Sequence, residues 1–224
     1  MLTRFAENVW TVDAPLSFLG MRIGTRMTVV RLPSGALLLH SPIELGAALR
    51  GEIDALGEVA HVVAPNVYHH LWAVDAARAY PRAKVHAPSG LRSKRPELRV
   101  DAKLDGARAE DFEGALVPHA IGGSMLQETV FVHPSTRSVI SSDLSENFVE
   151  APDHLPTKLY LQAGGILGKP GWHRLLRVVY RDRKAARRSI DALLEHDFDA
   201  LVLAHGRPIA RGARQAVRDT FAFL

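Results

Sequence analysis

Residues 59–88 read VAHVVAPNVYHHLWAVDAARAYPRAKVHAP and indicate the fold more clearly than any other part of the chain. The apolar run at the start predicts a buried strand, residues 71–80 predict a helix, and residues 83–88 predict a second strand. A strand, a helix and a strand in this order form a unit whose two strands pair in parallel. His69 and His70 therefore fall just beyond a strand end, where open α/β sheets place their ligands.

The residues before this unit predict antiparallel strands over 8–16, 27–33 and 36–42, with a hairpin turn at 33–35. A helix is expected to follow directly. Ser41 suits its N-cap, Pro42 its first position, and Glu44 a capping box. The apolar stripe of this helix would comprise Leu45, Leu49, Ile53 and Leu56.

The second half of the chain adds another hairpin and another α/β unit. Residues 128–133 and 137–143 predict two strands joined by a turn at 134–136, and residues 199–206 predict a buried strand between two helices. The region 144–171 is rich in Gly and Pro and predicts a lid or variable loop. The order of elements predicts two mixed β-sheets between helices, in one domain spanning residues 1–224.

Composition excludes several classes of protein. Apolar residues make up 47% of the chain and charged residues 23%, which is the balance of a soluble globular protein. The chain has no cysteine, which excludes disulfides, thiolate metal ligands and a thiol nucleophile. No apolar run approaches the roughly 18 residues of a membrane span, and MLTRFAENVW lacks the apolar stretch of a secretory signal. We therefore expect a cytoplasmic protein without a membrane partner.

Arginines are concentrated between residues 174 and 188, in a chain of formal net charge +4. Clustered arginine can attract phosphate, so nucleic-acid binding is one interpretation. However, an apolar stripe runs through the same segment at helical spacing, which favours a surface helix with a solvated basic face. Nucleic acid is therefore not the expected partner. The stripe comprises Ala186, Ile190, Leu193 and Leu194.

Three predicted strands end in residues that bind metals: His69 and His70, then Asp143, then His205. Neutral imidazoles and a carboxylate suit zinc or a similar divalent ion. Each residue also has an ordinary structural explanation. The histidine pair could begin a helix, Asp143 could cap a turn, and His205 could bond to backbone.

His119 and Glu128 are weaker candidates for the same site. His119 follows a strand and precedes two glycines, so it could be a further ligand. Glu128 could be a ligand, a partner that orients a ligating histidine, or an ordinary charge on an edge strand. Serine-hydrolase chemistry is not indicated, because the chain has no GxSxG motif, and no phosphate-binding glycine loop is present.

The order of these elements resembles the metallo-β-lactamase superfamily over most of the chain. Residues 36–45 resemble its early strand, residues 59–88 its metal loop and helix, residues 117–124 a later ligand loop, and residues 137–144 the strand bearing its bridging Asp. Residues 184–209 resemble its last helix and the strand before its final His. The resemblance implies a four-layer αββα sandwich of two mixed β-sheets.

The metal motif departs from the family pattern. The family has H-x-H-x-D-H where this chain has PNVYHH at residues 65–70. The resemblance implies that one of two metal sites is lost, leaving at most His119. The other is kept as His69, His70, Asp143 and His205. It implies one divalent ion, with zinc first and iron or manganese as alternatives, or no metal at all.

The function implied is hydrolysis of an ester, thioester or lactone-type bond by metal-activated water. His69 and Asp143 are the candidate catalytic residues, and His69 could act as a general base if it does not ligate. Residues 163–171, with Trp172, would shape the substrate entrance. The alternative is a non-catalytic member of the fold that binds a small molecule or a protein partner. A nucleic-acid-processing role comes third, and the sequence does not indicate an oligomeric state.

Overall fold

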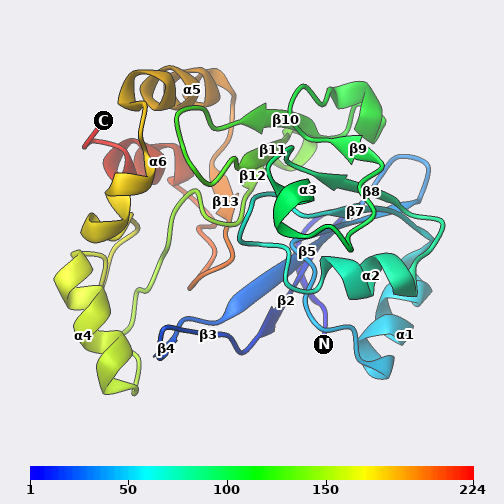
Figure 1. The fold of residues 1–224 in the computed structure, drawn as a ribbon, viewed down its shortest axis with the longest axis horizontal. Helices are drawn as coiled ribbons and strands as arrows, with labels where there is room; N and C mark the ends of the chain where they lie inside the picture. Colours follow the sequence, from blue (N-terminus) through cyan, green and yellow to red (C-terminus); the bar gives the residue numbers. More distant parts are fainter.

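A computed structural model describes residues 1–224. Two larger β-sheets and six α-helices make up the chain, together with a small hairpin and short 3₁₀ segments (Figure 1). The strands are β1 (Thr3–Ala6), β2 (Val9–Ala14), β3 (Ser17–Phe18), β4 (Met21–Arg22), β5 (Thr25–Arg31), β6 (Leu37–His40), β7 (Val59–Val63), β8 (Lys84–Ala87), β9 (Ala102–Lys103), β10 (Val117–Ala120), β11 (Thr129–His133), β12 (Ser138–Ile140) and β13 (Ala200–Val202). The α-helices are α1 (Ala47–Leu56), α2 (Ala73–Ala79), α3 (Leu91–Lys94), α4 (Leu155–Gly164), α5 (Arg183–Glu195) and α6 (Ala213–Thr220).

The larger sheet has the strand order β1-β2-β5-β6-β7-β8-β9. Its first four strands are antiparallel neighbours, and the pairs from β6 to β9 are parallel. The expected antiparallel start and the β-α-β unit are therefore both confirmed. The parallel strands β6 and β7 end at the same edge, which brings the loops that follow them together.

The smaller sheet has the order β10-β11-β12-β13. The strands β11 and β12 form the expected hairpin, and β13 joins β12 in parallel. Asp143 and His205 follow these two parallel neighbours along the chain, which brings the loops that hold them side by side.

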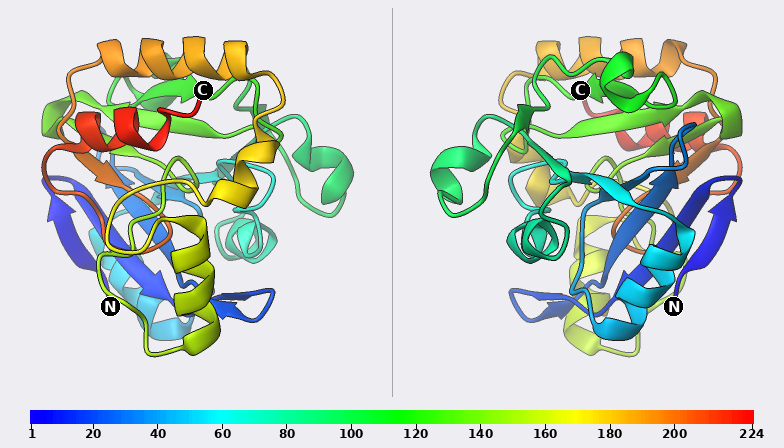
Figure 2. Two further views of the ribbon diagram at one scale, coloured as in Figure 1. Left: turned by 90° about the vertical axis from the view of Figure 1, so that its left-hand side faces the viewer. Right: turned by 90° about the vertical axis from the view of Figure 1, so that its right-hand side faces the viewer.

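Alternating side-chain directions along the apolar strands produce three cores. Leu37 and Leu39 of β6 face a core shared with α1 and α2, whereas Leu38 between them faces a core between the sheets. Likewise, Val130 of β11 faces α5 and α6, whereas Phe131 faces the other sheet. Because successive side chains on a strand point to opposite faces, one apolar strand fills two cores. Figure 2 shows the resulting layers, with α5 and α6 outside one sheet and α1 outside the other, which is the four-layer αββα sandwich.

The first helix begins later than the sequence predicted. It starts at Ala47 after Gly46, so Ser41 is not its N-cap and Pro42 is not its first residue. Ser41 instead adopts a left-handed conformation at φ 54°, and its backbone N–H donates to the Val63 carbonyl at 2.9 Å. This bond extends the pairing of β6 with β7 by one residue and turns the Ser41 side chain toward the loop after β7.

The second half of the arginine-rich region forms the expected surface helix, whereas residues 174–179 form a separate 3₁₀ segment. The helix α5 begins after Asp182, whose side chain accepts a hydrogen bond from the Ala185 N–H at 2.9 Å. The four apolar residues of its predicted stripe are all buried against the smaller sheet. No helix of the structure has both the length and the apolar character that crossing a membrane requires.

The Gly- and Pro-rich region 144–171 contains the helix α4, which the sequence did not predict. Figure 1 shows α4 away from both sheets, beside the β3–β4 hairpin. Thr157 of α4 accepts a hydrogen bond from the Arg22 N–H of β4 at 2.8 Å. The hairpin and α4 together extend the molecule beyond the strand ends that hold the candidate ligands.

Candidate metal centre

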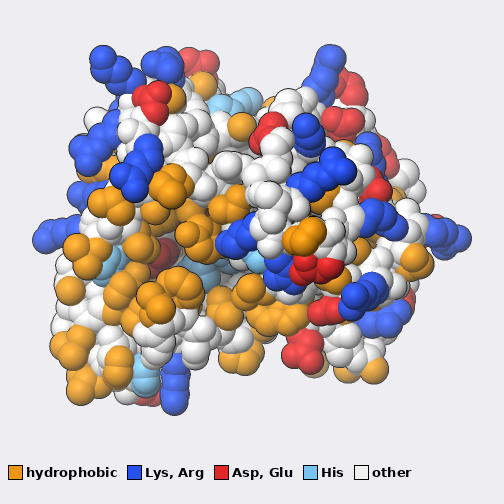
Figure 3. Space-filling view, in the orientation of Figure 1, with side chains coloured by type: hydrophobic (Ala, Val, Ile, Leu, Met, Phe, Trp, Pro, Cys, Tyr) orange, Lys and Arg blue, Asp and Glu red, His pale blue; other side chains and the backbone are white.

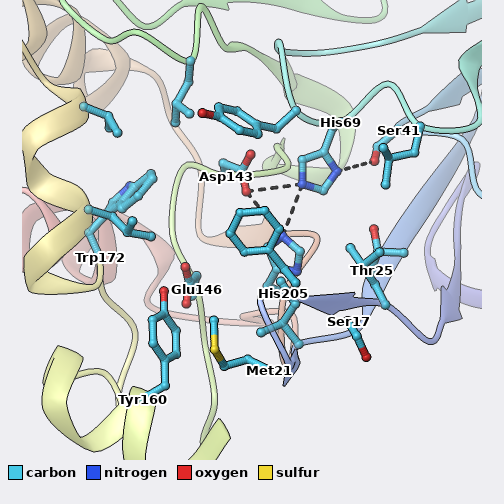
Figure 4. A pocket seen from close by; sticks show the side chains of 18 of the residues that line it. Ser17, Met21, Thr25, Ser41, His69, Asp143, Glu146, Tyr160, Trp172 and His205 are labelled. Atoms are coloured by element: carbon cyan, nitrogen blue, oxygen red, sulfur yellow. Dashed lines mark hydrogen bonds and ion pairs between the residues drawn. The ribbon is translucent and has the colours of Figure 1, made fainter. Parts of the chain in front are cut away.

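Three of the predicted ligands meet at one point. His69 comes from the loop between β7 and α2, Asp143 from the loop after β12, and His205 from the loop after β13. Figure 4 shows the three side chains pointing toward one another from these different elements. Asp143 and His205 converge because they follow the parallel neighbours β12 and β13, whereas His69 reaches them from the end of β7 in the other sheet.

The distances within this His-Asp-His cluster are nearly equal. The Nε2 atoms of His69 and His205 lie 3.2 Å apart. The Asp143 Oδ1 atom lies 3.3 Å from the Nε2 atom of His69 and 3.4 Å from that of His205. Around a tetrahedral zinc ion with bonds of about 2.0–2.1 Å, ligand atoms lie about 3.3–3.4 Å apart. The three donor atoms therefore fit one face of a zinc coordination shell.

The hydrogen bonds behind the two histidines direct their lone pairs into the cluster. The Nδ1–H of His205 donates to the Gly24 carbonyl at 2.7 Å, which leaves Nε2 of a neutral ring as an acceptor. Nδ1 of His69 lies 2.8 Å from the Ser41 hydroxyl, and donation there has the same effect. Two nitrogen lone pairs and a carboxylate oxygen then face one another. A proton satisfies one such contact, whereas a central cation satisfies all three.

Asn66 connects two of the ligand loops. Its side-chain oxygen accepts from the backbone N–H groups of Tyr68 and His69, at 2.7 and 2.8 Å. Its side-chain nitrogen donates to Asp143 Oδ2 at 2.7 Å and to the Ser142 hydroxyl. Because Oδ2 of Asp143 is occupied in this way, Oδ1 is the oxygen presented to the histidines. No pattern in the sequence indicated this role for Asn66.

Glu128 holds the Asp143 loop from behind. Its Oε1 atom accepts from the Ser142 N–H at 2.8 Å, the Ser142 hydroxyl at 2.9 Å and the Asp143 N–H at 2.9 Å. Burial, followed by repulsion from Asp143, raises the pKa of Glu128 to about 7. Glu128 therefore lies behind Asp143 and holds its loop, whereas the sequence had suggested a ligand, a partner of a ligating histidine or an ordinary edge-strand charge.

The electrostatic environment keeps the carboxylate ionised. Burial disfavours ionisation of Asp143, but His69 and His205 outweigh it and hold the pKa of this carboxyl below its ordinary value. Burial also disfavours a charged His205, but the hydrogen bond and attraction to Asp143 outweigh it and raise the pKa of His205. The cluster thus stabilises positive charge at its centre, as a metal site requires.

His70 points away from the cluster. It is buried, and its Nδ1 atom lies 3.2 Å from the guanidinium of Arg95, the residue that directly follows α3. Burial, together with Lys94 and Arg95, lowers the pKa of His70 to about 4. Adjacent residues at the corner before α2 diverge in direction, so the structure brings His69 to the cluster and leaves His70 outside it.

His119 also lies elsewhere. It belongs to β10, and its Nε2–H donates to the Ser189 carbonyl of α5 at 2.7 Å. Its ring contacts that of His196 edge-on, with centroids 5.9 Å apart. The geometry therefore gathers His69, Asp143 and His205, places Glu128 behind them, and does not bring His70 or His119 to them.

The cluster opens into a cavity of about 410 Å³. Its walls come from the β3–β4 hairpin, the loops that hold the ligands, α4 and the segment around Trp172. Figure 3 shows the hollow surrounded by hydrophobic side chains, with histidine visible in its depth. Trp172 lies in this wall, whereas none of residues 163–171, which were also expected to shape the entrance, contributes to it. Apolar lining residues include Leu16, Phe18, Met21, Ile23, Leu71, Trp72, Leu126, Leu176 and Val179.

Glu146 is a second acidic residue in the cavity, and no sequence pattern indicated it. Its carboxyl group makes no hydrogen bond or ion pair, and its Oε2 atom is buried. Burial raises the pKa of Glu146 to about 7, with opposing effects from His205 and Asp143. Figure 4 shows it below Trp172 and beside Tyr160.

A protein-family model described as "Domain of unknown function (DUF4336)" matches residues 6–170, which is well over half of the chain. The chain belongs to this family. No curated protein matches the sequence. The family description assigns no activity, so the chemistry of a DUF4336 protein has to be argued from its site.

Solved structures confirm the fold of this DUF4336 protein. A metallo-β-lactamase from Pontibacter korlensis matches with a TM-score of 0.70 at 14% identity, over 100% of this chain and 99% of that one. A metallo-β-lactamase from Erythrobacter litoralis, solved with β-mercaptoethanol in its active site, matches with a TM-score of 0.68 at 14% identity, over 100% and 96%. The mono-zinc form of the Pseudomonas aeruginosa metallo-β-lactamase FIM-1 gives 0.67 at 11% identity, over 100% and 95%. The DUF4336 chain therefore has the metallo-β-lactamase fold that its sequence resembles.

Proposed function

We propose that the protein is a hydrolase that uses a single divalent metal ion held by His69, Asp143 and His205. The observation that carries the proposal is the triangle of donor atoms, 3.2–3.4 Å on a side, at the base of an apolar cavity. Three protein ligands leave room for water or substrate, which distinguishes catalytic zinc sites from closed structural ones. A metal-binding group on this fold supports a metallo-β-lactamase-like hydrolase with one site.

A divalent ion bound there would polarise a carbonyl group and lower the pKa of a water molecule. The chain itself supplies the geometry. Asn66 and Glu128 fix Asp143, and Gly24 and Ser41 fix the two imidazoles. Groups that orient ligands in this way keep a site ready for reaction. In this arrangement Nε2 of His69 points into the cluster, so we assign His69 as a ligand rather than as a general base.

The cavity supports an ester, thioester or lactone as the substrate. All three ligands contribute to its lining, so a carbonyl group in the cavity can reach them. The surrounding wall is largely apolar and excludes water from a bound acyl group. Zinc is the first choice of ion, because the donor distances match tetrahedral zinc. Iron is the alternative, because two histidines and one carboxylate also bind iron(II).

Metal analysis of protein purified without chelator tests the proposal. We expect about one equivalent of zinc per chain, the number that one three-residue site holds. Replacing His69, Asp143 or His205 with alanine should abolish this binding. His70→Gln and His119→Gln are matched controls, because both histidines lie outside the cluster, and both variants should keep the metal. Protein that takes up no ion even with excess zinc, iron and manganese would leave the non-catalytic binding protein as the better account.

Hydrolysis is tested on a panel of 4-nitrophenyl esters, thioesters and lactones. Activity should rise with metal occupancy, disappear in His205→Ala and persist in His119→Gln. Metal-loaded protein that hydrolyses none of the panel would contradict the reaction while leaving the metal site standing.

A further inference from the structure

The backbone around Glu146 is fixed, yet its carboxyl group has no partner. The Glu146 N–H and carbonyl both bond to Gly171, at 3.0 and 2.9 Å. The next residue, Asn147, donates its N–H to the His205 carbonyl at 3.1 Å. Glu146 is thus held between the His205 loop and the segment leading to Trp172. The Oε2 atom of Glu146 is buried without a hydrogen-bond partner, which is costly, and a ligand that pairs with it would remove that cost.

The cavity lining contains acidic side chains but no lysine or arginine. Asp143 and Glu146 are its two carboxyl groups, and the contacts of Asp143 are taken by Asn66 and the histidines. Glu146 is therefore the one lining carboxyl that is free to meet a charged part of a ligand.

Two aromatic rings lie near this carboxyl. Figure 4 shows Trp172 above Glu146 and Tyr160 beside it. The Tyr160 ring stacks on His173 with centroids 4.0 Å apart, and Trp172 meets Tyr180 edge-on at 5.6 Å. Both rings are thereby held in place before any ligand binds. Where a cation meets an aromatic ring beside a carboxylate, the ring quadrupole adds to the attraction of the ion pair.

We infer that Glu146, Tyr160 and Trp172 form a subsite for a positively charged amine carried by an otherwise apolar substrate. The inference rests on the proposed hydrolase and names its substrate class, an aminoalkyl ester, thioester or lactone. A cation here gives Glu146 its missing partner. A carboxylate at the same position would face Glu146 with no basic side chain in the cavity to offset the repulsion.

Equilibrium binding of three matched eight-carbon probes tests the subsite without any turnover. The probes are octylammonium, 1-octanol and octanoate, titrated by isothermal calorimetry into protein as purified and after treatment with chelator. The second preparation removes direct binding of octanoate to metal. Octylammonium should bind at least about tenfold more tightly than 1-octanol, and octanoate more weakly than either.

Two carboxylates in one segment give a matched pair of variants. Glu146→Gln keeps the shape but removes the charge, so octylammonium binding should weaken about tenfold while 1-octanol binding stays within about twofold. Glu150→Gln removes an exposed carboxylate that pairs with Arg207 at 3.3 Å outside the cavity, and it should change neither. Tyr160→Leu should reduce the preference for octylammonium, whereas Tyr160→Phe should keep it. Octanoate binding as tight as octylammonium in chelated protein, or an unchanged preference in Glu146→Gln, would overturn the subsite.

The same preference should appear in turnover if the protein is a hydrolase. The 4-nitrophenyl esters of 6-aminohexanoate, hexanoate and adipate differ only at the distal end, and kcat/KM should fall in that order. Selective binding of octylammonium without hydrolysis of any ester would contradict the proposed reaction and keep the subsite. Hydrolysis of all three esters at equal kcat/KM would contradict the subsite and keep the reaction.

Discussion

Asn66 is the residue on which the geometry of the cluster depends most. One end of its amide holds the backbone of the His69 loop, and the other holds Asp143 Oδ2. It is fully buried, so its bonds are not exchanged for bonds to water. A side chain that orients a metal ligand typically changes metal affinity by about 10–100-fold when it is removed.

Asn66→Ala should therefore weaken zinc binding by about 10–100-fold, because Asp143 and the His69 loop both lose their common partner. Competition with a chromogenic chelator measures the change. Ser142→Ala is the graded control, since it leaves the Asn66–Asp143 hydrogen bond in place, and it should have the smaller effect. Equal zinc affinity in Asn66→Ala and the wild-type protein would show that Asp143 is held in place without Asn66.

The sequence could place the candidate ligands at strand ends but could not give the direction of each side chain. His69 and His70 are adjacent and chemically identical, and only the path of the loop turns one toward Asp143 and the other toward Arg95. Glu146 could not be predicted either, because nothing in the local sequence DLSEN (residues 143–147) shows that this side chain lies in a cavity. Such features depend on tertiary packing of loops, which local patterns do not encode.

Among the elements, the loop after β13 is tightly constrained at one glycine. Gly206 follows His205 at φ +86°, a conformation that side chains other than glycine rarely adopt. A Cβ atom there would lie 2.2 Å from the Asn147 carbonyl oxygen. The close approach of two backbones joins the His205 loop to the segment that carries Glu146.

Gly206→Ala should destabilise the fold by roughly 2–4 kcal/mol and displace His205, because it combines backbone strain with a steric clash. Gly212→Ala separates the two effects, since Gly212 has φ +76° but no atom within 4 Å of a built Cβ. It should cost only about 1 kcal/mol and leave zinc binding intact. Chemical denaturation and zinc titration of both variants provide the comparison, and equal losses in the two would contradict the role given to the contact with Asn147.

The strands and the β-α-β unit could be predicted because their apolar periodicity is strong and their turns are marked by Pro and Gly. The start of α1 could not, because Ser41, Pro42 and Glu44 form a plausible helix start that tertiary structure overrides. Ser41 pairs with Val63 and contacts His69 instead. Local capping signals compete with sheet pairing, and here the longer-range hydrogen bonds prevail.

At the scale of the whole molecule, buried neutral histidines tie stability to pH. Burial, followed by repulsion from His69, lowers the pKa of His40 from 6.5 to about 3. Both ring nitrogens of His40 lack a hydrogen-bond partner. The unfolded chain therefore binds a proton at this residue at a higher pH than the folded chain does. The free energy of unfolding is therefore unaffected by His40 titration above pH 6.5, where the ring is neutral in both states. It decreases as the pH falls toward 3, because only the unfolded chain takes up the proton.

His40→Leu should remove this dependence. Between pH 7.5 and pH 5 the free energy of unfolding should fall by about 2 kcal/mol more in the wild-type protein than in the variant. The reason is that only the unfolded wild-type chain gains the His40 proton. At pH 7.5 the variant should be equal or more stable, since it no longer buries unpaired ring nitrogens. Urea unfolding at the two pH values measures both effects. Parallel pH profiles for the two proteins would show that His40 does not titrate differently on unfolding.

In our proposal, three residues, and not four or six, form one metal site at the base of the cavity. Anomalous diffraction at the zinc absorption edge, from crystals of the zinc-loaded protein, tests it most directly. We expect one strong peak within about 2.2 Å of His69 Nε2, Asp143 Oδ1 and His205 Nε2. A peak beside His70 or His119, or no ordered zinc between His69 and His205, would contradict the account.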